Sequence, residues 1–144
     1  MKKKNILIIV SDYYEEISNN LLRETINELN YNEFIYTTET VTGVFEIPSI
    51  ISFAKYKFDG YVALGCVIRG ETSHYDYVCE ESARALMNLS LDGLALGYGI
   101  LTCENYEQAL ARSLSNNDMI GKGTVAAKAC INQIKLKRKY TYES

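Results

Sequence analysis

The chemically richest stretch of the sequence surrounds its only histidine, His74, within the run GCVIRGETSHYDYVC at residues 65–79. An arginine, a glycine, a glutamate and two hydroxyl residues stand directly before that histidine. Histidine is the side chain whose ordinary pKa lies near neutrality, so an imidazole within reach of a substrate suits general acid-base catalysis. His74 is therefore a candidate catalytic residue, and a structural hydrogen-bonding role is the alternative.

The residues before the histidine favour an anion site. Gly70 permits a sharp turn after an apolar run, and the backbone N–H groups of residues 71–73 lie where a helix is expected to begin. Such N–H groups lack helical partners and can converge on an anion. A phosphate ester is the expected ligand, because the chain contains no GxxxxGK[ST] nucleotide loop. A plain helix cap is the alternative, since Ser73 followed by Asp76 fits an acidic capping box.

Further candidate residues lie elsewhere in the chain. Arg112 suits a bidentate contact with phosphate, and Lys122, between two glycines, suits a point-charge contact. Cys66 is either a reactive thiol or, more simply, a small packed residue. Three aromatic residues near the expected strand ends either stack on a flat heterocycle or pack in the core: Tyr13, Phe45 and Tyr98.

Composition restricts the functional class. The 144 residues suit one domain, taken as 1–144, and 47% hydrophobic residues can build a single core. A formal net charge of -3 argues against nucleic acid as a partner, and the basic stretch 135–139 fits the last turn of a helix better than a binding patch. The apolar run 6–10 is too short for a signal peptide or a membrane span. Four scattered cysteines and one histidine indicate reduced thiols in a cytoplasmic protein without a metal site.

Short apolar runs alternate with segments of helical period, which predicts an α/β protein. The expected strands are 6–10, 33–41, 61–68 and 94–101, and the expected helices are 17–29, 48–57, 74–91, 104–114 and 124–136. Because right-handed crossovers put helices on both faces, this order predicts a three-layer αβα sandwich around a four-stranded parallel, flavodoxin-like sheet. Ligands of such sheets bind beyond the carboxyl ends of the strands, so the candidate site lies in the loops after the four strands.

Several segments resemble the lumazine synthase (6,7-dimethyl-8-ribityllumazine synthase) family of riboflavin biosynthesis. They are GVFEIP at 43–48, LGCVIRGETSHYDYVC at 64–79, GILTCENYEQALAR at 99–112 and GKG at 121–123. The similarity runs from the first strand to the last helix. It implies a transferase-type enzyme that condenses 5-amino-6-(D-ribitylamino)uracil with 3,4-dihydroxy-2-butanone 4-phosphate, releasing phosphate and water, with neither metal nor organic cofactor.

The resemblance also implies a role for each matching residue. His74 would transfer protons. The residues expected to contact the ribitylaminouracil are Tyr13, Val44, Phe45, Glu46, Cys66, Val67, Ile68 and Tyr98. Those expected to contact the butanone phosphate are Glu71, Thr72, Arg112 and Lys122. In the family, the arginine and the aromatic residue that correspond to Arg112 and Tyr98 come from a neighbouring subunit.

Shared sites require an oligomer, and the family forms homopentamers, some of which assemble into sixty-subunit shells. The loop 113–121 is about two residues longer than expected of shell-forming relatives, which favours a free pentamer or a pair of pentamers. Three residues depart from the family pattern: Asp12 replaces a frequent arginine, Thr42 a usual proline and Val44 a common alanine.

Two other functions are compatible with this fold. A non-catalytic carrier of a lumazine or flavin would be expected to lack the histidine, the arginine or the GET turn, all of which are present here. A flavodoxin-like FMN protein would carry a hydroxyl-rich phosphate loop after the first strand, where this chain has SDYY at 11–14.

Overall fold

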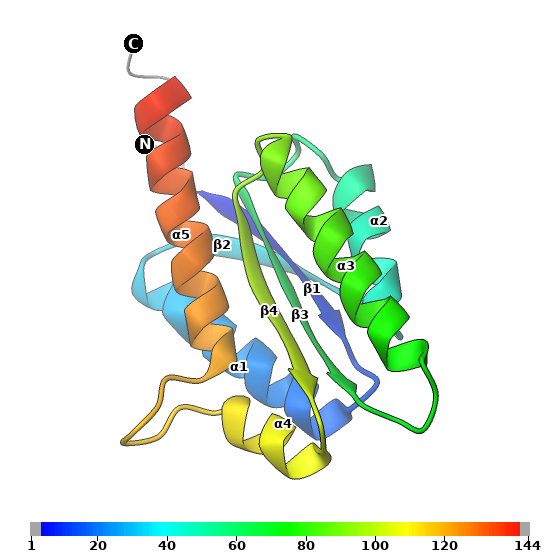
Figure 1. Cartoon of the computed structure of the whole chain (residues 1–144). Helices are drawn as coiled ribbons and strands as arrows, with labels where there is room; N and C mark the ends of the chain where they lie inside the picture. Colours follow the sequence, from blue (N-terminus) through cyan, green and yellow to red (C-terminus); the bar gives the residue numbers. More distant parts are fainter. Residues whose placement is uncertain (1–3, 142–144) are drawn as a thin grey trace.

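The computed structural model describes residues 4–141 (Figure 1). Its centre is a four-stranded sheet in the order β2-β1-β3-β4, in which every pairing is parallel. The strands are β1 (Asn5–Ser11), β2 (Ile35–Val41), β3 (Gly60–Ile68) and β4 (Leu96–Cys103). Central parallel strands are covered on both faces, which is why β1 and β3 are almost continuously apolar while the edge strand β2 is largely exposed.

Helices cover both faces of the sheet (Figure 1). The helices α1 (Glu15–Tyr31), α4 (Tyr106–Arg112) and α5 (Lys122–Thr141) pack on one face. The other face is covered by α2 (Ile47–Phe53) and α3 (His74–Leu91), with the short 3-10 helix η1 (Val44–Glu46) before α2. Alternate residues of β1 enter the two apolar clusters: Ile6, Ile8 and Val10 on one side, Leu7 and Ile9 on the other. The predicted three-layer αβα fold with a flavodoxin-like parallel sheet is thereby confirmed.

Each expected strand and helix is present, and the differences concern their ends. The helix α4 begins later than predicted because Asn105 caps it, with its side-chain oxygen accepting the Gln108 backbone N–H at 2.9 Å. The helix α5 starts at Lys122, so this lysine is the first helical residue and not part of a loop. The basic stretch 135–139 lies within α5, as predicted.

The helix α5 approaches β4 closely because β4 carries glycine at the point of contact. A Cβ atom at Gly97 would collide with the backbone carbonyl of Ala126 and would lie 3.1 Å from the Cβ of Cys130. This approach lets Ala126 and Cys130 be fully buried. The backbones of the edge strand β4 and the last helix α5 therefore approach each other closely at Gly97 and Ala126.

Gly97→Ala should lower the free energy of unfolding by about 1–3 kcal/mol, because α5 must shift as a unit to admit the methyl group. Urea unfolding followed by circular dichroism measures this change. The control is Gly70→Ala, since a Cβ at Gly70 meets nothing within 4 Å. Equal stability of the Gly97 variant and the wild type would contradict the proposed backbone contact.

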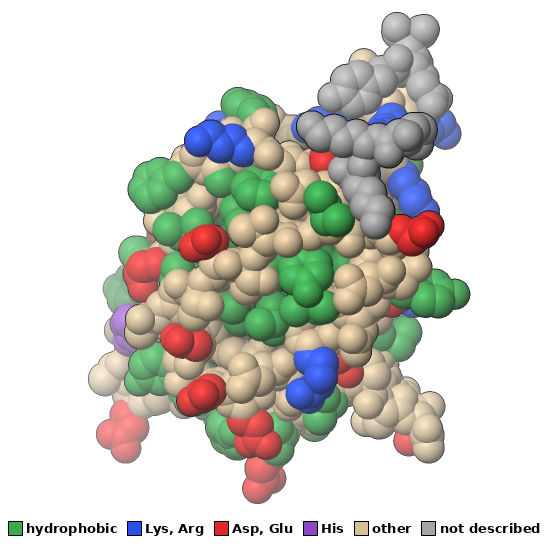
Figure 2. All heavy atoms as spheres, turned by 180° about the vertical axis from the view of Figure 1, so that it is seen from behind, with side chains coloured by type: hydrophobic (Ala, Val, Ile, Leu, Met, Phe, Trp, Pro, Cys, Tyr) green, Lys and Arg blue, Asp and Glu red, His purple; other side chains and the backbone are tan. Residues whose placement is uncertain are grey.

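The surface seen from behind carries mixed charges. Figure 2 shows Lys and Arg side chains scattered among acidic and hydrophobic ones on this face. Within residues 4–141, no helix combines the length and the apolar character needed to cross a bilayer.

Candidate functional site

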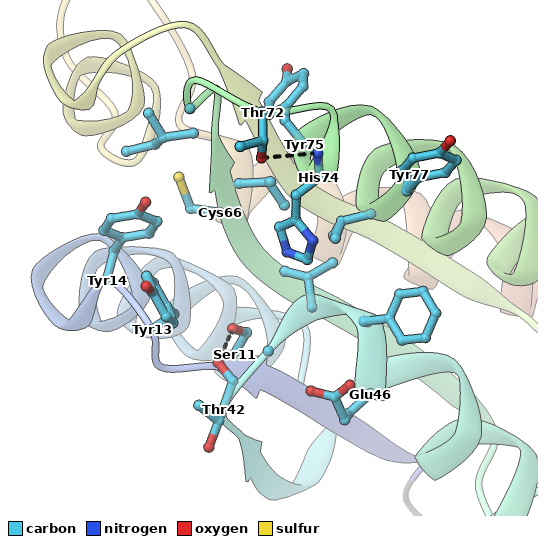
Figure 3. A pocket seen from close by; sticks show the side chains of 17 residues that line it. Ser11, Tyr13, Tyr14, Thr42, Glu46, Cys66, Thr72, His74, Tyr75 and Tyr77 are labelled. Atoms are coloured by element: carbon cyan, nitrogen blue, oxygen red, sulfur yellow. Dashed lines mark hydrogen bonds between the residues drawn. The ribbon is translucent and has the colours of Figure 1, made fainter.

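A cleft of about 690 Å³ opens at the carboxyl ends of β1 and β3 (Figure 3). Its walls come from the β1–α1 loop, the segment from Thr42 through η1, the end of β3 and the start of α3. These segments meet because parallel strands all end at the same edge of the sheet. The cleft thus lies where the sequence placed the candidate site.

Most of the predicted site residues line this cleft. They are Tyr13, Val44, Phe45, Glu46, Cys66, Val67, Ile68, Thr72 and His74. Glu71 is an exposed residue of the turn before α3 and does not line the cleft.

Several residues that line the cleft were not among the predicted site residues: Ser11, Tyr14, Thr42, Tyr75, Tyr77 and Val78. Tyr14 and Thr42 belong to loops already expected to form the site, so their position along the chain was a usable signal. Tyr75 and Val78 carried a weaker signal, because their helical spacing equally fits a face packed on the core.

The cleft has an apolar floor and an aromatic rim. Val44 and Cys66 are only 4% and 5% exposed, whereas Tyr13 and Phe45 are 68% and 56% exposed. Tyr13 lies edge-on to Tyr14, with ring centroids 5.0 Å apart. Exposed rings beside an apolar floor suit the faces of a flat heterocycle, while the floor contacts its edge.

His74 projects into the cleft from the first turn of α3, toward the segment that carries Thr42 and Glu46 (Figure 3). The residue is exposed, and within residues 4–141 no hydrogen bond to its imidazole is found. This arrangement disfavours the structural alternative for the histidine. It leaves both ring nitrogens accessible to a ligand in the cleft.

The start of α3 does not use the capping box that the sequence suggested. Ser73 occupies the N-cap position, but its side chain makes no capping hydrogen bond. The Thr72 hydroxyl oxygen instead accepts the His74 backbone N–H at 3.3 Å. The Asp76 carboxylate is engaged by Arg69 at 3.3 Å, so it does not reach back to the N-cap. The expected Ser73–Asp76 box is therefore wrong.

Arg69 fastens the turn that leads to His74. Its guanidinium pairs with Glu104 at 2.9 Å and with Asp76 at 3.3 Å, and it lies 4.4 Å from the centroid of the Tyr75 ring. The hydrogen bond with Glu104 is the main cause that raises the pKa of Arg69. Each exposed pair contributes little alone. Together they connect the end of β3 to α3 and to the segment after β4.

The remaining predicted residues gather in a second pocket of about 390 Å³ along the edge strand β4. Lys122 Nζ lies 5.6 Å from the centroid of the Tyr98 ring, and the Arg112 guanidinium donates to the Gln108 carbonyl at 3.3 Å. In the part of the chain that the structure describes, neither cation is paired with a carboxylate. Their positive charge therefore remains available to an anion.

Within one chain, the two groups of predicted residues line different pockets. Of residues 4–141, the first cleft is lined by one carboxylate, Glu46, and by no lysine or arginine. The second, over the same residues, is lined by Arg112 and Lys122 and by no aspartate or glutamate. The two pockets are thus complementary in charge.

Cys66 behaves as a packed residue of the cleft floor. Burial, reinforced by the neighbouring Cys103, raises the pKa of the Cys66 thiol to about 12. Burial also raises the pKa of Cys103, while the adjacent Arg112 guanidinium acts in the opposite direction. All four cysteines are free. A thiol that stays protonated near neutral pH favours packing over the reactive-thiol alternative.

At pH 8, Cys66 should react with iodoacetamide about 1,000-fold more slowly in the native protein than in the urea-unfolded chain, because its pKa of about 12 leaves little thiolate. Peptide mapping by mass spectrometry measures the rate at each cysteine. Cys79, which is only half-buried, is the internal control and should be labelled earlier. Labelling of native Cys66 at the unfolded rate would contradict this account.

An apolar and aromatic cleft beyond the carboxyl ends of a parallel sheet, with one imidazole directed into it, defines the chain as an α/β enzyme acting on small molecules. Residues 3–138 match the family model described as 6,7-dimethyl-8-ribityllumazine synthase. The chain belongs to the 6,7-dimethyl-8-ribityllumazine synthase family.

Curated relatives extend this match over nearly the whole chain. The chain is 48% identical to the 6,7-dimethyl-8-ribityllumazine synthase of Bartonella tribocorum, covering 96% of this chain and 93% of the relative. It is 44% identical to the protein of the same name in Sphingopyxis alaskensis, covering 94% and 96%. Identity is 42% with 6,7-dimethyl-8-ribityllumazine synthase 1 of Rhizobium meliloti, covering 96% and 95%. The resemblance carried by the sequence motifs is confirmed, and the chain is a transferase-type enzyme of riboflavin biosynthesis.

Proposed function

We propose that this chain condenses 5-amino-6-(D-ribitylamino)uracil with 3,4-dihydroxy-2-butanone 4-phosphate to give 6,7-dimethyl-8-ribityllumazine, phosphate and water. The observation that carries the proposal is the convergence of His74 and the GVFEIP and GCVI segments on one cleft. Family membership supplies the reaction, and the cleft offers the apolar, aromatic and acid-base groups that it requires.

In this proposal, the first cleft binds the ribitylaminouracil. Tyr13 and Phe45 contact the faces of the pyrimidine, and Val44 contributes a backbone and apolar contact. The Glu46 carboxylate accepts hydrogen bonds from hydroxyls of the ribityl chain. The end of β3 meets the pyrimidine edge through Cys66, Val67 and Ile68.

The butanone phosphate occupies the space between the start of α3 and the cationic pocket of a neighbouring subunit. Glu71 and Thr72 present backbone N–H groups, and Thr72 adds a hydroxyl. Arg112 and Lys122 of the neighbour neutralise the phosphate, and the neighbour's Tyr98 closes the heterocycle pocket. The separation of the two pockets within one chain supports this division.

The chemistry proceeds by proton transfers that a single base serves. The uracil amine adds to the ketone and loses water to form an imine. Phosphate then leaves by β-elimination, the resulting enol tautomerises to a ketone, and the ribityl-bearing amine attacks this ketone and closes the ring with loss of a second water. His74 moves protons in these steps, while Arg112 and the α3 N–H groups stabilise the departing phosphate. Holding two substrates together supplies much of the remaining acceleration.

The proposed enzyme is a cytoplasmic, single-domain protein of residues 1–144 that acts as a homopentamer, either free or as a pair of pentamers. It uses neither metal nor organic cofactor. Assembly follows from the proposed site, because no lysine or arginine of residues 4–141 lines the first cleft and a phosphate there takes its cations from another chain.

His74→Ala should lower turnover by about 10- to 1,000-fold, because the reaction loses its positioned base but keeps both binding pockets. Lumazine fluorescence after mixing the purified protein with both substrates measures turnover. Undiminished turnover would remove His74 from the mechanism. Substrate binding without product by the wild type would favour the non-catalytic carrier instead.

Arg112→Ala should raise KM for the butanone phosphate by about tenfold or more, with little change in KM for the uracil, since a charge-assisted contact to phosphate is lost. Arg84→Ala is the matched control, because Arg84 is exposed on α3, pairs with Glu81 and lines neither pocket. An unchanged KM for the butanone phosphate in the Arg112 variant would exclude its proposed role.

Multi-angle light scattering should give the mass of five chains of 16.3 kDa, about 80 kDa, or twice that value for a pair of pentamers. A monomer would contradict the shared site. A particle near one megadalton would instead indicate a sixty-subunit shell.

A further inference from the structure

A row of polar side chains on α1 holds the segment that connects Arg112 to Lys122. Near the start of this segment, Asn20 Nδ2 donates to Ser113 Oγ at 3.1 Å. Beyond its end, Thr25 Oγ1 donates to the Gly123 carbonyl at 3.0 Å. Asn20, Thr25 and Ser113 are all buried, so these contacts are shielded from water.

Glu24 lies between these two contacts and binds the segment most extensively. Its Oε2 accepts the Ser115 backbone N–H at 2.5 Å, and its Oε1 accepts the Ser115 hydroxyl at 2.7 Å and the Thr124 hydroxyl at 2.8 Å. The Ser115 hydroxyl oxygen in turn accepts the Gly121 backbone N–H at 2.8 Å. One carboxylate therefore joins both ends of the loop 113–121, through charge-assisted hydrogen bonds.

The first glycine of the GKG motif is explained by the same contact. Gly121 is buried, and a Cβ atom there would collide with the Glu24 carboxylate and would lie 2.8 Å from the backbone of both Leu114 and Ser115. The loop is thus closed tightly over Glu24. Gly121 serves this closure, which places Lys122 at the start of α5.

We propose that Glu24 is a positioning residue that fixes Arg112 and Lys122 relative to each other and so sets the affinity for the phosphate group. Arg112 directly precedes Ser113, and Lys122 directly follows Gly121, so each cation is one residue from an atom in this network. The inference rests on the proposed function for the identity of the phosphate substrate, but the contact network is independent of it.

A loop fixed before binding costs less conformational entropy when the ligand arrives. Without the Glu24 carboxylate, the Ser115 N–H and two hydroxyls lose their acceptor, and the loop samples other arrangements. The two cations then match the phosphate only part of the time. Phosphate affinity should therefore fall, while the pyrimidine cleft, which Glu24 does not line, should keep its affinity.

Glu24 also contributes little to the core. The apolar contacts of α1 are made by Ile17, Leu21 and Leu29, which are fully buried, whereas Glu24 is only half-buried. Substitution of Glu24 should consequently leave the fold intact. The chain also offers a matched control in Glu28, one turn later on α1. Its carboxylate accepts a hydrogen bond from the Asn32 side chain at the C-terminal end of the same helix.

The experiment titrates inorganic phosphate into the full-length assembled protein by isothermal calorimetry and records amide hydrogen exchange of the loop. Glu24→Ala should weaken phosphate binding about tenfold, and exchange at Ser115 and Gly121 should accelerate about tenfold or more. Glu28→Ala should change neither quantity. Glu24→Gln should give a smaller loss, since its amide group can still donate to the Ser115 and Thr124 hydroxyls.

Steady-state kinetics separate positioning from a general structural defect. Glu24→Ala should raise KM for the butanone phosphate about tenfold while KM for the uracil and kcat stay within about twofold. Because Glu24 acts through Arg112 and Lys122, adding Glu24→Ala to Arg112→Ala should weaken phosphate binding less than it does in the wild type.

An unchanged phosphate affinity in Glu24→Ala overturns the proposal, as does a wild type that binds no phosphate. A loss of thermal stability in both Glu24→Ala and Glu24→Gln, with equal losses in kcat and both KM values, also overturns it, because that pattern marks a folding role. If phosphate binding responds as expected but the wild type makes no lumazine, the proposed reaction fails and the role of Glu24 stands.

Discussion

The parallel alignment of β1 and β3 is the constraint on which the rest of the structure depends. These central strands pair from Ile6 with Gly60 to Val10 with Leu64, so both strands end at the same edge of the sheet. One exit leads to Tyr13 and the other to the turn before His74. The loops after β1 and β3 can both be short, because the pairing of these strands places the two loops on opposite walls of one cleft. The burial of β1 and β3 on both faces, which supplies much of the folding free energy, therefore also fixes the width of the site.

A second constraint is electrostatic. Among the residues that the structure describes, Glu46 is the only carboxylate lining the first cleft and no lysine or arginine lines it. A phosphate bound there would find backbone N–H groups and hydroxyls but no cation from this part of the chain. Arg69 cannot supply the charge, because Glu104 and Asp76 already neutralise it. The two unpaired cations of the second pocket lie at the β4 edge of the sheet. In the proposed shared site, this separation of the cations from the first cleft would make phosphate binding depend on assembly.

The sequence was sufficient to predict the fold and the edge of the sheet at which the site lies. The periodicity of hydrophobic residues and the turn residues identify the strands and helices. Burial imposes this periodicity directly on elements such as β1 and α1. The helix ends were less predictable from hydrophobic periodicity. The Asn105 cap of α4 is a local contact with Gln108 that the residue type at 105 could have indicated, whereas the start of α5 at Lys122 follows a loop held by Glu24 of α1. The Ser73–Asp76 capping box is absent because Ser73 has helical backbone angles and the Asp76 carboxylate binds Arg69, seven residues before it in the chain. Glu24 carried no local signal at all, because its partners lie about 90 residues further along the chain.

The helix α1 connects the two pockets within one chain. Its N-terminal end follows Tyr13 and Tyr14 at the rim of the first cleft, and its middle holds the segment between the two cations. A helix is stiff over this length, so the aromatic rim and the cationic loop keep a fixed separation. In the proposed assembly, the aromatic rim of one chain and the cations of its neighbour contact a single substrate pair. In the proposed pentamer, a rigid α1 would couple the position of the loop on one chain to the site that this loop completes on the next chain. The buried contacts of Asn20 and Thr25 with the loop region give α1 the means to impose this spacing.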